Sequence, residues 1–347
     1  MVFRSSSRTI SIPSLIAIFA IAVFAVASFG CSRLQPAGPA VEEPRLTETA
    51  VITADGYQLP MRHWDPVDEP RAIVLGVHGF SDYSNAFGAV SEAVTAQGFA
   101  LYAYDQRGFG ATEPKGIWAG QATLVADLKT VLHLLRQRHP DKPMYLISES
   151  MGGAVAALAL TDPGAPPING ALLLAPAVWG RDVMPWYQRV GLAITDFLAP
   201  GMTFSGKMAG RFGVSATDDP VFARALRLDP LVQKQARVDT LDGLSDLMSA
   251  ALKALPRIPR PALLLYGASD EVIPPQAMCA LLVQVPDGGA PWRMVLYPKG
   301  FHLLTRYSGA ATTDADIAAW LNDQSAALPS GDEVSIAAAR QRLCKGN

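Results

Sequence analysis

The stretch "LISESMGG", Leu146 to Gly153, has a serine between a short apolar run and a pair of glycines. The residues before it, "PMYLI", have the pattern of a buried strand, and "GGAVAALALTD" after it is typical of a helix of small residues. We therefore expect Ser150 at a tight strand-to-helix turn, which can expose a nucleophilic hydroxyl at the edge of a sheet. A serine here can also be an ordinary helix N-cap.

Apolar strands alternate with amphipathic helices on both sides of this turn. A hairpin with Asp55-Gly56 at its tip comes first, and strands are expected in "RAIVLGVHGF", "ALYAYD", "PMYLISE", "GALLLAPA", "PALLLYG" and "WRMVLYP". The segment "SNAFGAVSEAVTAQGF" has helical spacing and ends at Gly98. Unbroken apolar strands separated by helices predict an α/β fold, with a mostly parallel central sheet flanked by helices on both faces. We expect this core at residues 48–177 and 257–347.

Residues 178–256 interrupt the alternation. They show no clear strand but several helical pieces rich in aromatic residues and methionine, which predicts an inserted helical cap. Trp179, Met184, Trp186 and Tyr187 are the candidates for an apolar substrate pocket above Ser150. The alternative is that these side chains only pack the cap onto the core.

A base and an acid for Ser150 follow from chain order, which is serine, acid, histidine in folds with this turn. His302 is the only one of the five histidines that comes after Ser150, and it lies just past the last apolar strand. Asp270 follows the strand before that one, and Glu271 is the fallback. A short aspartate side chain on a fixed loop can orient an imidazole.

An oxyanion hole requires two backbone N–H groups near the serine. One is expected from Met151, the residue after the nucleophile. The other is expected from Phe80, because His78-Gly79 bends the chain after an early strand.

Charge and cysteine content exclude several classes of function. The formal net charge of −2, without a basic block, argues against a nucleic-acid partner. No C-x-x-C, zinc-type Cys/His set or H-E-x-x-H occurs, so no metal site or cofactor is expected. Cys279 and Cys344 could form a disulfide in an exported protein, or they could be unrelated thiols.

The N-terminus has the features of an export signal at residues 1–30. Arg4 and Arg8 precede an apolar run from Leu15 to Ala27, which is shorter than the about 20 residues of a membrane span. Ala25-Val26-Ala27 fits ordinary signal cleavage, and an uncleaved anchor from Ile10 to Phe29 is a further alternative. Gly30-Cys31 resembles a bacterial lipoprotein site, with Cys31 as the lipidated residue and residues 31–47 as a Pro-rich tether. We favour this reading, which predicts an envelope lipoprotein facing the periplasm or the exterior.

The chain resembles the monoacylglycerol lipase and lysophospholipase branch of the α/β hydrolases. The matching stretches are "TADGYQLPMRHWDP", "GVHGFSDYSNAF", "YAYDQRGFGAT", "ISESMGG", "PALLLYGASDEVIP" and "YPKGFHLL", within residues 50 to 326. The resemblance implies nucleophile Ser150, acid Asp270, base His302, and oxyanion amides from Phe80 and Met151. Ser148 departs from the glycine of the family's G-x-S-x-G pattern, and Asp105 and Arg107 match a turn that we interpret as structural.

These observations predict an exported, membrane-tethered serine hydrolase that cleaves carboxylic esters of the monoacylglycerol or lysophospholipid type. A small-ester carboxylesterase or a thioesterase is the alternative among enzymes. A binding protein on a retired hydrolase fold is the non-enzymatic alternative, and such a protein would be expected to lack a triad member. The sequence leaves the acyl length, the alcohol group and the oligomeric state open.

Overall fold

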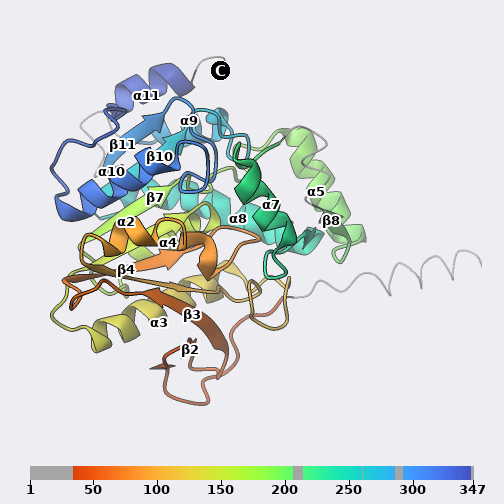
Figure 1. The fold of residues 1–347 in the computed structure, drawn as a ribbon. Coiled ribbons are helices and arrows are strands. Elements are labelled where there is room, and N and C mark those ends of the chain that lie inside the picture. The colour runs from red at the N-terminus through yellow and green to blue at the C-terminus, as the bar shows by residue number, and fades with distance from the viewer. Residues whose placement is uncertain (1–33, 206–213, 260, 286–291, 345–347) are drawn as a thin grey trace, which may run out of the picture.

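The computed structural model describes residues 34–205, 214–259, 261–285 and 292–344, so the predicted export signal and Cys31 lie outside the described residues. The described chain forms one nine-stranded sheet in the order β1-β2-β3-β5-β4-β6-β7-β10-β11 (Figure 1). The strands are β1 (Arg45–Leu46), β2 (Ala50–Ile52), β3 (Gln58–Trp64), β4 (Ala72–Val77), β5 (Phe99–Tyr104), β6 (Met144–Glu149), β7 (Gly170–Leu174), β10 (Ala262–Gly267) and β11 (Trp292–Tyr297).

The six strands from β5 to β11 in this order are parallel, and β1, β2 and β3 add an antiparallel edge. Every residue of β4, β5, β7 and β10 is buried, as their unbroken apolar sequences require for strands covered on both faces. The predicted fold class is therefore confirmed.

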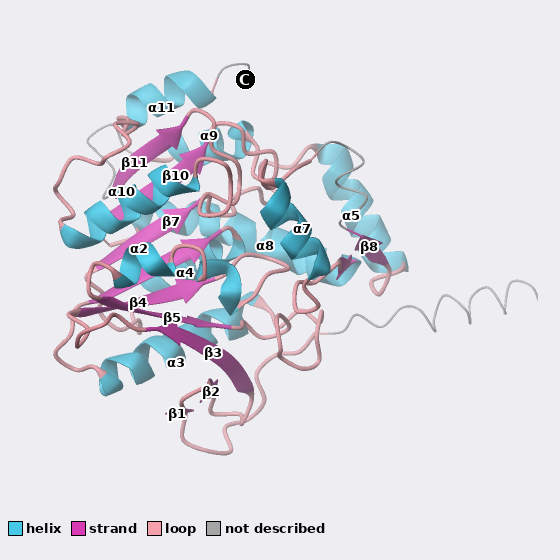
Figure 2. Ribbon diagram, in the orientation of Figure 1, coloured by secondary structure: helices cyan, strands magenta, loops and turns pink. Residues whose placement is uncertain are grey.

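Helices cover both faces of the sheet (Figure 2). They are α2 (Ser91–Thr95), α3 (Gln121–Arg138), α4 (Met151–Thr161), α9 (Pro275–Leu282), α10 (Ala310–Asn322) and α11 (Ile336–Leu343). The apolar side chains of α3, α4, α9 and α11 join one buried cluster, and those of α2 and α10 join the cluster on the other face. A disulfide between Cys279 of α9 and Cys344 at the end of α11 fixes the C-terminal helix to the core.

The first helix after β4 differs from the prediction. The segment expected to be one helix consists of a short 3₁₀ helix, η1 (Ser84–Phe87), and the five-residue α2. Gly98 follows α2 with a φ of 77°, a backbone conformation that favours glycine and ends the helix. The sequence pattern thus predicted the end of this segment correctly, but it did not predict the break between η1 and α2.

The cap lies between β7 and β10 and packs beside the carboxyl ends of the strands (Figure 1). It contains α5 (Trp186–Leu198), β8 (Thr203–Ser205), α7 (Pro220–Leu228), β9 (Gln235–Arg237) and α8 (Val238–Ala254). Strands β8 and β9 pair antiparallel, which corrects the expectation of a purely helical cap. Three-residue strands are too short to show a periodicity in the sequence.

The start of the described chain is held against the core. The Gln35 N–H donates to the Trp118 carbonyl (2.8 Å), the Ala37 N–H to Thr123 Oγ1 (3.1 Å) and the Gly38 N–H to Asp55 Oδ2 (2.8 Å). The backbone at residues 35–38 is therefore bonded to the core, in the part of the predicted tether that the structure describes.

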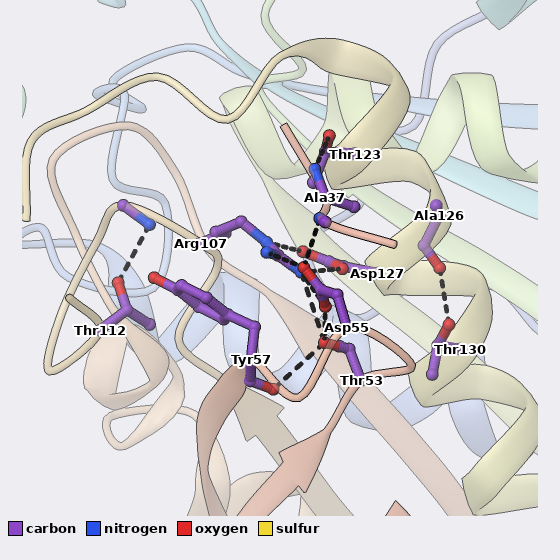
Figure 3. A network of polar contacts seen from close by, with 12 residues as sticks. Ala37, Thr53, Asp55, Tyr57, Arg107, Thr112, Thr123, Ala126, Asp127 and Thr130 are labelled. Atoms are coloured by element: carbon purple, nitrogen blue, oxygen red, sulfur yellow. Dashed lines mark hydrogen bonds and ion pairs between the residues drawn. The ribbon is translucent and has the colours of Figure 1, made fainter. Parts of the chain in front are cut away.

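Arg107 joins the N-terminal hairpin to α3 (Figure 3). Its buried guanidinium pairs with Asp55 (2.8 Å) and Asp127 (3.0 Å) and lies 4.0 Å from the centre of the Tyr57 ring. Two carboxylates from distant parts of the chain thus share one cation, which fits the structural role expected for Arg107.

Candidate active site

Ser150 lies at the turn between β6 and α4, as the sequence predicts. Its φ of 53° and ψ of −117° are strained for a residue with a side chain. The Ser150 N–H donates to the Leu174 carbonyl (2.9 Å), and the Gly153 N–H donates to the Ser150 carbonyl (2.9 Å). Hydrogen bonds on both sides of the residue therefore hold the strained backbone in place.

Small residues around Ser150 allow this turn to pack closely. A Cβ atom on Gly152 would lie 2.0 Å from the Val77 carbonyl oxygen, so only glycine fits between α4 and the end of β4. Ser148, which replaces the glycine of the usual pattern, is fully buried, and its hydroxyl donates to the Leu172 carbonyl (3.2 Å). The larger residue at position 148 is thus accommodated without leaving its hydroxyl unpaired.

Asp270 and His302 form a buried pair beside the turn. Asp270 Oδ2 lies 2.8 Å from His302 Nδ1, while Asp270 Oδ1 accepts the N–H groups of Val272 and Ile273, both at 2.8 Å. Because an ionised carboxylate only accepts, Nδ1 holds the ring proton and Nε2 keeps a free lone pair. Glu271, the fallback acid, is exposed and accepts the Ser215 N–H instead.

The charges around His302 favour its protonated form. Burial of the imidazole works against protonation, but the Asp270 carboxylate and then the Glu149 carboxylate outweigh it, so the pKa of His302 is raised. A raised pKa suits a base that must first take a proton from a hydroxyl and then return it to a leaving group. Among the described residues, neither Ser150 Oγ nor His302 Nε2 makes a hydrogen bond, which leaves both atoms available to a substrate.

The loop after β4 faces the nucleophile turn. A Cβ atom on Gly79 would lie 3.1 Å from the Ser150 Cβ, so this loop lies directly against the serine. The N–H groups of Phe80 and Met151, predicted as oxyanion donors, make no hydrogen bond within the described part of the chain. Two unpaired donors next to a nucleophile are what an oxyanion hole requires.

His78 orients the peptide between Gly79 and Phe80. The Gln106 N–H donates to His78 Nε2 (2.9 Å), so Nδ1 holds the proton and donates to the Gly79 carbonyl (2.8 Å). Burial lowers the pKa of His78, which keeps the ring neutral. Because the C=O and N–H of a trans peptide point in opposite directions, fixing the Gly79 carbonyl toward His78 turns the Phe80 N–H away from it.

The four predicted pocket residues lie in different surroundings. Trp179 is half-buried against the core cluster, and Met184 is half-buried too. Trp186 and Tyr187 are 70% and 59% exposed at the start of α5, with their rings in edge-to-face contact. Their contact with a substrate stays a prediction.

Sequence reasoning missed a set of buried charges next to the triad. Arg306 pairs with Asp82 (2.7 Å) and Glu149 (2.6 Å), and all three side chains are buried. The sequence did hold one signal, because a glutamate within an otherwise apolar strand, directly before a nucleophile, needs a cationic partner.

Known proteins with similar sequences are hydrolases. The family described as "Serine aminopeptidase, S33" matches residues 68–306. The monoglyceride lipase of Mus musculus is 23% identical over 84% of this chain and 99% of its own length. The monoacylglycerol lipase of Mycolicibacterium smegmatis is 26% identical over 79% of this chain and 96% of its own.

Solved structures show the same fold. The monoacylglycerol lipase of Paleococcus ferrophilus superposes with a TM-score of 0.62 at 21% identity, covering 77% of this chain and 99% of that one. A soluble variant of the Saccharomyces cerevisiae monoglyceride lipase, in complex with a substrate analog, has a TM-score of 0.65 at 18% identity, covering 84% and 100%. Since the family match covers more than half of the sequence and includes Ser150, Asp270 and His302, the chain belongs to the serine aminopeptidase S33 family of α/β hydrolases.

Proposed function

We propose that this protein is a serine hydrolase that cleaves the ester bond of monoacylglycerols. The observation that supports it most is the strained Ser150 turn, with the Asp270–His302 pair and two unpaired amides beside it. The relatives named monoglyceride or monoacylglycerol lipase, which this chain matches over almost their whole length, support the substrate class.

The geometry supports an acyl-enzyme mechanism. His302 Nε2 takes the proton of Ser150 Oγ as the oxygen attacks the acyl carbonyl, and Asp270 stabilises the imidazolium that forms. The N–H groups of Phe80 and Met151 donate to the oxyanion. His302 then protonates the departing glycerol oxygen, and water releases the fatty acid by the same steps.

Labelling with a fluorophosphonate and a substrate panel test this proposal. We expect wild-type protein to be labelled at Ser150 and to hydrolyse monoacylglycerols, while Ser150→Ala does neither. Lysophospholipids, short p-nitrophenyl esters, thioesters and aminoacyl amides complete the panel, because the family description names an aminopeptidase. Preference for an amide, or labelling of the Ser150→Ala variant, would refute the proposal.

A series of esters of increasing acyl length tests the proposed acyl pocket. Each methylene that leaves water adds about 0.8 kcal/mol, so kcat/KM should rise from acetate to octanoate in monomeric esters. Trp186→Ala should flatten this slope if its ring contacts the chain. A maximum at acetate, with decline beyond butyrate, would instead indicate a small-ester esterase.

We also propose that the enzyme is exported and works on a membrane surface. The disulfide between Cys279 and Cys344 supports an oxidising compartment. Helix α5 supports work at a membrane surface, because none of its residues is buried and most of its large apolar side chains are exposed, among them Trp186, Ile194 and Phe197 (54% to 85%). No helix within the described ranges has the length and apolar character needed to cross a bilayer.

Two measurements test this second proposal. Mass spectrometry of the mature protein should find lipid on Cys31, whereas an unmodified terminus at Ser28 would refute the lipoprotein. Protein lacking the first 33 residues should still float with phosphatidylglycerol vesicles, and Phe197→Ser should weaken flotation severalfold. The control is Val67→Ser, which changes a fully exposed apolar residue in the turn after β3. Equal loss in both variants would refute a role for α5.

A further inference from the structure

One arginine lies between two carboxylates next to the triad. Arg306 Nη1 donates to Asp82 Oδ2 (2.7 Å), and Nη2 donates to Glu149 Oε1 (2.6 Å). The three side chains are 5%, 10% and 3% exposed, so water does not screen the pairs. This buried cluster is not required by the acyl-enzyme steps themselves.

Each member of the cluster comes from a segment that supplies one part of the reaction. Glu149 directly precedes the nucleophile Ser150, Asp82 follows the oxyanion donor by two residues, and Arg306 follows the base by four. A planar guanidinium holds two carboxylates in fixed directions. One side chain thus connects the nucleophile turn, the oxyanion loop and the base loop.

Further hydrogen bonds transmit this connection to the backbone. The Asp82 N–H donates to the Gly79 carbonyl (3.3 Å), and Asp82 Oδ1 accepts the Tyr83 N–H (2.9 Å), so the aspartate shapes the oxyanion loop. The Arg306 N–H donates to the Leu303 carbonyl (2.9 Å), and its own carbonyl accepts Thr217 Oγ1 (2.6 Å) from the cap. Movement of the guanidinium would therefore displace all three loops relative to one another.

We propose that Arg306, with Glu149 and Asp82, is a positioning residue of the ester hydrolysis, which aligns the nucleophile, the oxyanion amides and the base with one another. The inference rests on the proposed function, because it concerns the same site. Arg306 does not have to touch the substrate, since it acts through the backbone of the segments that do.

The cluster also sets the charge around the base. The charged or titratable groups that surround His302 and its loop are Asp270, Glu149, Arg306, Asp82 and His78. Glu149 favours the imidazolium and Arg306 opposes it, so the two have opposite effects on the pKa of His302. Burial raises the pKa of Glu149, and the Arg306 guanidinium, 2.6 Å from Glu149 Oε1, opposes this rise by favouring the carboxylate.

Conservative variants separate alignment from charge. Arg306→Lys keeps the positive charge but cannot span both carboxylates as a planar fork, so we expect kcat to fall on the order of tenfold, with KM unchanged and the pH profile unmoved. Glu149→Gln keeps the shape but removes one negative charge near His302. The acidic limb of kcat/KM should then move about one unit to lower pH.

Arg107 is the matched control. It is also buried and pairs with two carboxylates, Asp55 and Asp127, but these pairs join the N-terminal hairpin to α3 and do not involve a triad residue. Arg107→Lys should lower the melting temperature as Arg306→Lys does, yet leave kcat and the pH limb of the folded enzyme unchanged. All rates are measured on folded protein at 25 °C with a monomeric ester.

Failure of this inference can be distinguished from failure of the proposed function. If wild-type protein hydrolyses none of the esters, the proposed function fails before these variants matter. If the wild type is active but Arg306→Lys keeps kcat within about twofold, as Arg107→Lys does, Arg306 is only structural and the inference is refuted. An unmoved acidic limb in Glu149→Gln would likewise refute the link between this cluster and the base.

Discussion

Substitution of Ser148 tests how far the nucleophile turn depends on the residue at the first glycine position of the G-x-S-x-G pattern. Replacing Ser148 with glycine restores the usual G-x-S-x-G pattern. If only the pattern mattered, this substitution would stabilise the protein. The structure predicts the opposite for stability, because the Ser148 side chain is fully buried and its hydroxyl donates to Leu172 of the neighbouring strand at 3.2 Å.

The loss can be worked out in three parts. The hydrogen bond contributes about 1 kcal/mol. A glycine inside a strand costs about 0.5–1 kcal/mol in unfolded-state entropy. Removing a buried CH₂ costs about 0.8 kcal/mol more. Ser148→Gly should therefore lose about 2–3 kcal/mol in the free energy of unfolding, which lowers the melting temperature by about 5 °C in a domain of this size.

Thermal unfolding and ester hydrolysis together test this reasoning, with Ser148→Ala as the matched variant. Ser148→Ala loses only the hydrogen bond, so its melting temperature should fall by about 2 °C. Neither variant should change kcat/KM by more than about twofold, because backbone bonds hold Ser150 and do not involve the Ser148 hydroxyl. A tenfold change in kcat/KM at an unchanged melting temperature would show that the hydroxyl acts in the reaction and not in packing.

Three further substitutions have defined outcomes. Ser150→Ala should lower kcat by up to about a millionfold with the melting temperature retained, and residual activity of a few per cent would assign the nucleophile elsewhere. Asp270→Asn should lower kcat on the order of 10⁴-fold, because an amide no longer fixes the His302 tautomer; a loss under tenfold would contradict this role. Cys344→Ser opens the link to Cys279 across 65 residues and should cost about 3–4 kcal/mol in denaturant unfolding, whereas an unchanged midpoint would mean that α11 is held by packing alone.

The core could be predicted from sequence because its elements are regular. Unbroken apolar strands allow only a sheet covered on both faces, and in such a sheet the residues just after each strand gather at one edge. Ser150, Asp270 and His302 each follow a different strand, so chain order alone brought them to the same edge. The pairing of Asp270 with His302 at 2.8 Å then needed no information beyond the strand ends.

The Arg306 cluster could not be predicted in the same way. Its members are charged residues separated by up to 224 positions, and nothing in the sequence indicates which arginine reaches which carboxylate. Periodicity reports only which face of an element is buried, not the pairing of polar groups from different loops. The same limit applies to Arg107. Its resemblance to a turn of the family predicted a structural role, but it did not predict that Asp55 and Asp127 are the two partners.

The cap is the region in which sequence pattern and burial disagree most. The apolar residues of α5 recur at helical spacing, which usually marks a face packed on a core, yet Phe197 is 85% exposed. Helix α8, with fewer aromatic residues, is the one that packs on α4 and buries Leu247 and Ala251. An amphipathic pattern therefore shows that a helix has an apolar face but does not identify what covers that face. The apolar face of α5, which the described protein leaves exposed, is therefore the feature that the vesicle-flotation experiment tests.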